Sequence, residues 1–116
     1  MAYDRIKAIQ EDLTIHVGLG ATMSVGSDSY PYYVSERLPN NVIGLYRPGS
    51  HFTVDWTDGS MTVDAFDSNA KSTLYIKRRY GKWWEVQRDG TPIRRFTSRY
   101  ERLSFGSATA YRDPSF

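Results

Sequence analysis

The residues best suited to chemistry lie in a run that mixes cations with aromatic rings, Lys77-Arg78-Arg79-Tyr80-Gly81-Lys82-Trp83-Trp84. Arginines follow this run at positions 94, 95, 99, 102 and 112. Guanidinium groups bind phosphate through paired hydrogen bonds, and planar rings stack on bases. The pattern therefore suits a nucleotide or a single-stranded nucleic acid. It also suits a solvated strand face, on which long basic stems cover the rings.

The chain offers little for covalent catalysis. It has no cysteine, which excludes disulfides, thiolate zinc sites and a cysteine nucleophile. His16 and His51 both fall in strand-like alternation, and neither neighbours a G-x-S-x-G motif. Residues 18–20, GLG, precede a strand rather than a helix, so they lack the helix N-terminus that binds phosphate. We expect a binding protein that is not an enzyme and uses no metal or cofactor.

The charge of the chain is divided unevenly. Residues 1–70 carry four basic residues against nine acidic ones, a net charge of −5, and residues 71–116 carry eleven against four, a net charge of +7. The basic half either meets a phosphate-bearing ligand or complements the acidic half, within one sheet or between subunits. No run approaches the about 20 apolar residues of a membrane helix, so we expect no membrane partner.

The elements that must position these residues are strands. Ile6, Ile9 and Leu13 share one helical face, which predicts a short helix or arm over residues 1–12. From residue 13 to 116 we expect one antiparallel sheet, with hairpin turns at Asp58-Gly59 and Gly81. The predicted fold class is all-β or β-rich α+β, a small antiparallel barrel or sandwich in a single domain. Its strands are expected over residues 13–17, 21–25, 30–38, 42–47, 51–56, 61–66, 72–80, 82–88, 93–96, 100–105 and 108–112.

Two segments together resemble a known group. They are residues 26–34, GSDSYPYYV, and the C-terminal stretch with RLSFG at 102–106 and YRDPSF at 111–116, with a basic hairpin at 74–86 between them. These resemble a widespread group of small phage and prophage proteins, over roughly residues 18–116. Through that group the chain resembles a phage Thoeris anti-defence family, the signal sponges.

The resemblance implies a function. Such sponges are β-rich homo-oligomers, with a hexamer as one expected state, that act in the cytoplasm of the infected bacterium. They bind a cyclised ADP-ribose signal, and some members bind cyclic oligonucleotides of the kind used in CBASS defence. They sequester the ligand without cleaving it. The residues of this chain compatible with such a site are Arg99, Arg102, Arg112, Asp113, Trp83, Trp84, Ser27, Asp28 and Tyr30.

The C-terminal motif admits two readings. Pro114 fixes its own φ and disfavours helix at Asp113, so a bend can bring Arg112 and Asp113 to one side. Arg112 would then bind a phosphate, and Asp113 would accept from a ribose hydroxyl or an exocyclic amine. Alternatively the segment is a structural anchor, in which Arg112 pairs with an acid such as Asp28 or Asp64.

Two other functions are compatible with the sequence. One is a phage virion or assembly protein whose charge asymmetry drives subunit contacts, which predicts a large assembly and no ligand. The other is a small-barrel protein that binds single-stranded nucleic acid, with an affinity that falls steeply with salt. A sponge predicts tight binding of a small ligand without turnover.

The first testable prediction is that the protein is a homo-oligomer. It rests on the opposite net charges of the two halves, the aromatic content of 15% and the limited core of a small domain. Light scattering at micromolar concentration is expected to give a multiple of the 13.3 kDa chain mass. A monomer alone at that concentration would contradict the prediction.

Overall fold

The computed structural model describes residues 14–52, 59–79, 81–93 and 103–112. This part of the chain contains nine strands and a single turn of 3-10 helix at Pro39–Asn41. No described helix is long and apolar enough to cross a membrane. The strands are β1 (Gly20–Val25), β2 (Asp28–Leu38), β3 (Val42–Tyr46), β4 (Ser50–Phe52), β5 (Ser60–Val63), β6 (Leu74–Arg79), β7 (Lys82–Val86), β8 (Leu103–Phe105) and β9 (Ala110–Tyr111).

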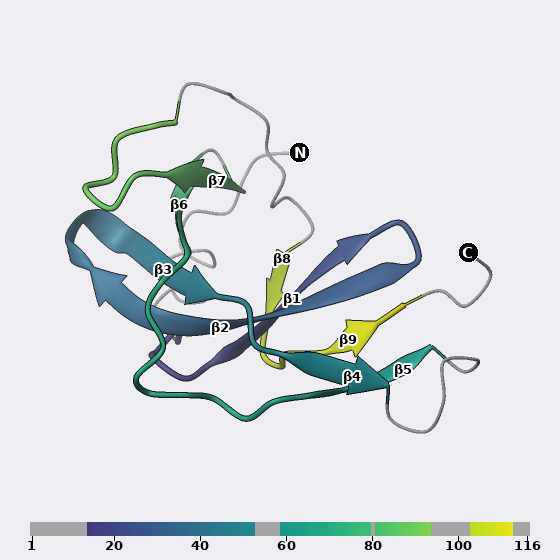
Figure 1. Cartoon of the computed structure of the whole chain (residues 1–116). Helices are drawn as coiled ribbons and strands as arrows, with labels where there is room; N and C mark the ends of the chain where they lie inside the picture. Colours follow the sequence, from purple (N-terminus) through teal and green to yellow (C-terminus); the bar gives the residue numbers. More distant parts are fainter. Residues whose placement is uncertain (1–13, 53–58, 80, 94–102, 113–116) are drawn as a thin grey trace.

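The nine strands form one antiparallel sheet (Figure 1). Its main path runs β4-β5-β9-β2-β3-β6-β7, and β1 pairs with both β2 and β8. The β6–β7 hairpin therefore lies at one end of the path and β4 at the other. The predicted β-rich antiparallel class is confirmed.

The core lies where part of this sheet curls on itself. In the series β8-β1-β2-β3-β6-β7, the two end strands meet through side chains, because the rings of Trp83 and Phe105 have their centroids 5.3 Å apart. Inside this curl lie residues from every strand of the series, among them Ala21, Val34, Leu45, Ile76 and Leu103. A small antiparallel β-fold can enclose a core in this way with few aliphatic residues, because each aromatic ring buries a large area.

Strand β2 changes partners along its length. Residues 28–33 pair with β1, Ser29 also pairs with Tyr111 of β9, and residues 33–38 pair with β3. Pro31 cannot donate a backbone hydrogen bond because it lacks an amide proton. This does not interrupt the pairing with β9, because only Ser29 of β2 is paired with that strand. The register with β3 shifts between Val34 and Glu36, which leaves Ser35 as a bulge and bends the strand.

The hairpin predicted at Gly81 is present, whereas the two-residue turn predicted at Asp58-Gly59 does not fit the register of β4 and β5, because Phe52 lies opposite Met61 where such a turn would place residue 56. β6 and β7 are paired up to Arg79 and Lys82, and Gly81 takes a φ of 79°, which favours glycine. β4 and β5 pair antiparallel, and Gly59 has a φ of 75°. Asp58 lies outside the described residues.

The strand predicted over residues 13–17 is wrong in its described part. None of the residues 14–17 forms a strand: Thr14 and Val17 lie in turns and Ile15 and His16 are irregular. The second turn is closed by the Leu19 amide, which donates to the His16 carbonyl at 3.0 Å. Gly18 has a φ of 93°, so the chain reverses there before joining β2, where the Gly18 amide donates to the Val34 carbonyl. The alternation of apolar and polar residues that predicted this strand reflects a single buried side chain, Ile15, and not one face of a sheet. The helix or arm predicted over residues 1–12 lies outside the described residues.

Gly20 provides a test of the packing between β1 and the segment before β9. A Cβ there would lie 2.3 Å from the Ala108 amide nitrogen, so Gly20→Ala requires the backbone to shift. We expect a loss of about 3 kcal/mol in the free energy of unfolding, measured in urea. Gly26→Ala is the control, because it meets open space and has only the strain of its φ of 59°, which costs about 1 kcal/mol. An equal or smaller loss for Gly20→Ala would contradict this packing.

Candidate functional site

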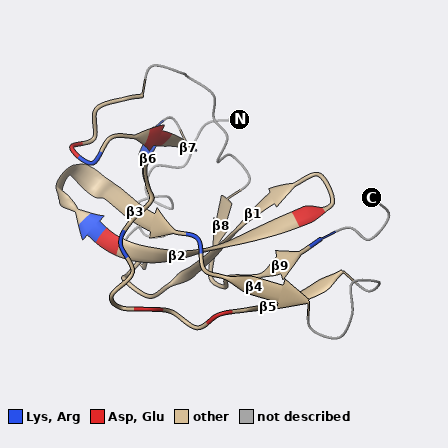
Figure 2. Ribbon diagram, in the orientation of Figure 1, with Lys and Arg blue, Asp and Glu red and all other residues tan. Residues whose placement is uncertain are grey.

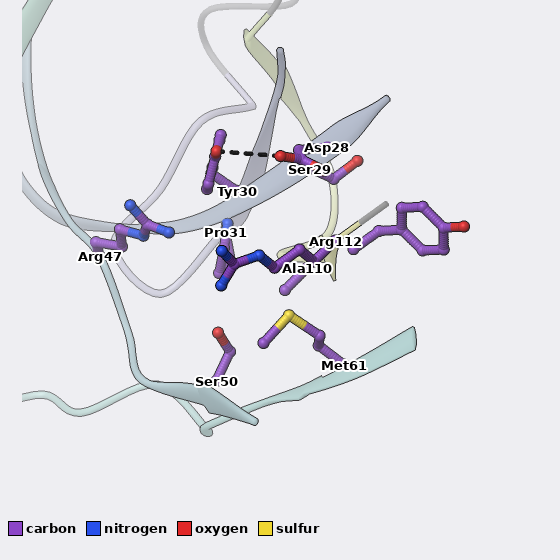
Figure 3. A pocket seen from close by; sticks show the side chains of 10 residues that line it. Asp28, Ser29, Tyr30, Pro31, Arg47, Ser50, Met61, Ala110 and Arg112 are labelled. Atoms are coloured by element: carbon purple, nitrogen blue, oxygen red, sulfur yellow. Dashed lines mark hydrogen bonds between the residues drawn. The ribbon is translucent and has the colours of Figure 1, made fainter. Parts of the chain in front are cut away.

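A pocket of about 250 Å³ opens beside the first residues of β2, where β4, β5 and β9 approach it (Figure 3). Its volume is just below the about 300–1,000 Å³ typical of ligand pockets. Apolar, hydroxyl and charged groups all contribute to its wall. The lining residues are Asp28, Ser29, Tyr30, Pro31, Arg47, Ser50, Met61, Ala110, Tyr111 and Arg112.

Two arginines dominate the charge of this pocket. Arg47 follows β3 and Arg112 follows β9. Their side chains point towards one another across the opening (Figure 3). The ribbon is blue where basic residues lie, and acidic residues are red (Figure 2). Arg47 is held over the Tyr30 ring, with its guanidinium carbon 4.4 Å from the ring centroid. The salt bridge considered for Arg112 with Asp28 or Asp64 is not formed among the described side chains, whose ion pair is Arg88–Glu36. Neither Arg47 nor Arg112 therefore forms an ion pair with another residue of the described chain.

Asp28 and Tyr30 supply the other polar groups on β2. The Tyr30 hydroxyl donates to Asp28 Oδ2 at 3.5 Å, a long and therefore weak hydrogen bond. Both residues lie on the same side of the strand, since they are two apart. A carboxylate next to two cations lets the pocket contact hydroxyl or amine groups of a ligand as well as an anion.

Gly59 places Arg112 at the pocket. The Arg112 amide donates to the Gly59 carbonyl at 3.0 Å, and a Cβ on Gly59 would lie 2.5 Å from the Arg112 carbonyl oxygen. Glycine thus permits β9 to lie close to the start of β5. On the other side of β9, Tyr111 pairs with Ser29, which fixes the distance between the two halves of the pocket wall.

The structure brings together three of the residues singled out from the sequence, Asp28, Tyr30 and Arg112. Ser27 lies in the exposed turn between β1 and β2 and does not line the pocket. Arg99, Arg102 and Asp113 lie outside the described residues. Sequence reasoning missed Arg47, because its place depends on the long-range pairing of β2 with β3; the only local signal was an arginine before Pro48-Gly49, directly after a buried strand.

The two tryptophans lie elsewhere. Trp83 is 4% exposed and packs in the core, with the Arg78 guanidinium 4.5 Å above its ring. Its edge lines a separate hollow of about 390 Å³ that Arg78, Leu103 and Phe105 also line. Trp84 is half-buried on the opposite side of the β6–β7 hairpin. Neither ring lines the pocket beside β2.

A second polar cluster surrounds Glu36, next to the bulge of β2. Its Oε1 accepts from the Ser72 hydroxyl at 2.7 Å and from the Tyr75 hydroxyl at 3.3 Å, and its Oε2 accepts from Arg88 at 3.0 Å. These hydrogen bonds, led by that of Ser72, hold the pKa of Glu36 below its ordinary value. The cluster ties β2 to the segment before β6, which indicates a structural role.

No group of three histidine or acidic side chains within the described ranges could hold a metal ion. Comparison with known proteins finds no matching family, no significantly similar curated protein and no significantly similar solved structure.

The Glu36 cluster predicts a pH dependence of stability. A lowered pKa in the folded state stabilises the fold above the unfolded pKa of about 4.5, and this contribution disappears as the pH falls through the folded value. Urea unfolding of Glu36→Gln is therefore expected to differ most from the wild type at pH 7 and to converge with it below pH 4.5.

Two further variants separate the partners of Glu36. Ser72→Ala should remove more of the pH-dependent difference than Arg88→Ala, because the hydrogen bond of Ser72 is the largest cause of the shift and Arg88 is 65% exposed. A larger effect of Arg88→Ala would show that the ion pair, rather than the hydroxyl, controls the carboxylate.

Proposed function

We propose that the protein binds a small phosphate-bearing nucleotide in the pocket beside β2 and retains it without cleaving it. The observation that carries this proposal is the pair of guanidinium groups, Arg47 and Arg112, that face one another across the pocket (Figure 3). Two like charges in one opening repel each other, and a bound anion relieves that repulsion. Guanidinium forks bind phosphate in two-point geometry, so a phosphate or pyrophosphate is the group that suits them best.

The rest of the wall suits the rest of a nucleotide. Pro31, Met61 and Ala110 provide apolar surface for a base or sugar. The Asp28 carboxylate and the hydroxyls of Ser29 and Ser50 can bond to ribose hydroxyls or to an exocyclic amine. Tyr30 contributes through Arg47, because their stacking holds the guanidinium in place before a ligand arrives.

The wall gives little support to hydrolysis. Its described residues include serine and aspartate but no histidine that could activate a hydroxyl. Retention of a ligand needs affinity and specificity, and both come from fixed donors in a partly enclosed space.

The biological setting we propose follows from the resemblance to the signal sponges. The ligand would be a cyclic nucleotide immune signal, either a cyclised ADP-ribose or a cyclic oligonucleotide, made in a bacterium under phage attack. Sequestering that signal would protect an infecting phage. The volume of about 250 Å³ is enough for only part of such a ligand, so a homo-oligomer would supply the remaining contacts.

The proposal is tested by ligand capture. The protein is incubated with an extract of phage-infected cells in which nucleotide signalling is active, washed and heated, and released molecules are identified by mass spectrometry. We expect an intact nucleotide, and in direct titration with cyclic ADP-ribose variants we expect Arg112→Ala and Arg47→Ala each to weaken binding about ten- to a hundredfold. Thermal melting and oligomer size should change little, because neither guanidinium has an ion pair in the described structure.

Lys71→Ala is the matched control, since it removes one exposed cation from a loop outside the pocket. Release of a cleaved nucleotide would contradict retention without turnover. If Arg112→Ala lowers the melting temperature but leaves capture intact, the C-terminal segment is a structural anchor and the pocket is not the site.

A further inference from the structure

The chain has three methionines, and one of them, Met61 of β5, lines the pocket beside β2. Figure 3 shows its side chain extending from β5 to the side of the pocket where Arg112 lies. Met61 is half-buried, in the wall of a cavity of about 250 Å³. A molecule not much larger than water, which takes up about 30 Å³ in the liquid, therefore fits beside this thioether.

The register of β5 and β9 places Met61 on the same face as Arg112. Met61 is paired with Ala110, and two residues further along the Arg112 amide donates to the Gly59 carbonyl at 3.0 Å. Cross-strand partners share a face of a sheet, and so do residues two apart on one strand. Met61 and Arg112 are therefore diagonal neighbours on one face, at a separation that long side chains can span.

Met23 of β1 lies in different surroundings. It is paired with Tyr30 and with Leu103, and it packs against the hydrophobic core. Met23 and Met61 are both half-buried, so the difference between them lies in what surrounds each side chain. Met1 lies outside the described residues. The chain thus carries its own reference, with one methionine in the pocket and another against the core.

Oxidation changes what a methionine presents to a ligand. A thioether is apolar and a weak hydrogen-bond acceptor, whereas its sulfoxide is polar and carries an oxygen that accepts hydrogen bonds. Hydrogen peroxide supplies this oxygen atom: its O–O bond breaks, an S–O bond forms, the sulfur gives up two electrons, and water is released. Methionine sulfoxide reductases reverse the step with two electrons from thiols.

We propose that Met61 is a reversible oxidation site at which peroxide weakens ligand binding in the pocket. This inference rests on the proposed function, because it concerns regulation of the same site. The sulfoxide oxygen accepts from the Arg112 guanidinium and so competes with a phosphate for its N–H donors. The oxygen also makes an apolar part of the wall polar, and it takes up room in a pocket that is already small for a ligand site.

The first test is peptide mapping by mass spectrometry after timed exposure of the full chain to hydrogen peroxide. Arg37 lies between Met23 and Met61, so trypsin places the two methionines in different peptides. We expect Met61 to gain one oxygen atom several-fold faster than Met23. Equal rates, or a faster reaction at Met23, would overturn the assignment of Met61 as the reactive methionine.

The second test is calorimetric titration with inorganic pyrophosphate before and after treatment with peroxide. We expect oxidation to weaken binding about tenfold, and methionine sulfoxide reductases to restore the original affinity. Met61→Leu has no sulfur at this position, so its affinity should be the same before and after peroxide. Met23→Leu is the matched control and should lose affinity to the same extent as the wild type. Met61→Gln, which places an amide oxygen in the pocket wall, should weaken binding without any oxidant.

The inference and the proposed function fail in different ways. If the untreated protein binds neither pyrophosphate nor a nucleotide from the extract, the proposed function fails and the control of binding fails with it. If the untreated protein binds pyrophosphate and oxidation leaves the affinity unchanged, only the role of Met61 is overturned. The same holds if Met61→Leu loses affinity on oxidation as the wild type does. The melting temperature should change little on oxidation, and a loss of affinity that accompanies unfolding would also overturn the proposal.

Discussion

The structure depends on the way that β2 is shared. Its first half is paired with β1 and touches β9, its second half is paired with β3, and the bulge at Ser35 bends the chain between them. Because one strand joins these neighbours, a change in its register would move all of them together. The same strand carries Asp28 and Tyr30 into the pocket at one end and Glu36 into the cluster with Ser72 at the other. The pocket and the curl of the sheet are therefore two results of one pairing pattern.

Much of the fold could be predicted from local patterns, and the pocket only in part. Alternating runs and glycine turns located most of the strands because hairpins are local structures, as at Gly81. The error at residues 14–17 arose because alternation alone does not distinguish a strand from a turn with one buried anchor, Ile15. Arg47 could not be found, since only the long-range pairing of β2 with β3 brings it to Tyr30. Trp83 and Trp84 are adjacent in sequence, and the alternation of a strand sends one to the core and the other to the outer face.

Folding brings part of the net negative charge of residues 1–70 together with part of the net positive charge of residues 71–116. Arg88 of the basic half pairs with Glu36 of the acidic half, so part of the opposition is compensated within one sheet. Arg47, one of four cations in residues 1–70, instead joins Arg112 at the pocket. The sequence asymmetry thus overstates the separation of charge within the described part of the fold. Among the described residues, the two guanidinium groups at the pocket beside β2 form no ion pair with a described carboxylate.

The enclosure of the pocket beside β2 determines how the binding that we propose should respond to salt. The pocket has facing cations, a carboxylate and apolar walls in about 250 Å³. The binding that we propose there would depend on geometry and be less sensitive to salt than binding to exposed cations, because partly enclosed charges are less screened. The pocket and the β6–β7 hairpin lie in different parts of the sheet, with β2, β3 and β6 between β9 and β7 in the strand order. The ligand that we propose for the pocket would therefore lie away from the β6–β7 hairpin, and substitutions in that hairpin should leave its binding unchanged.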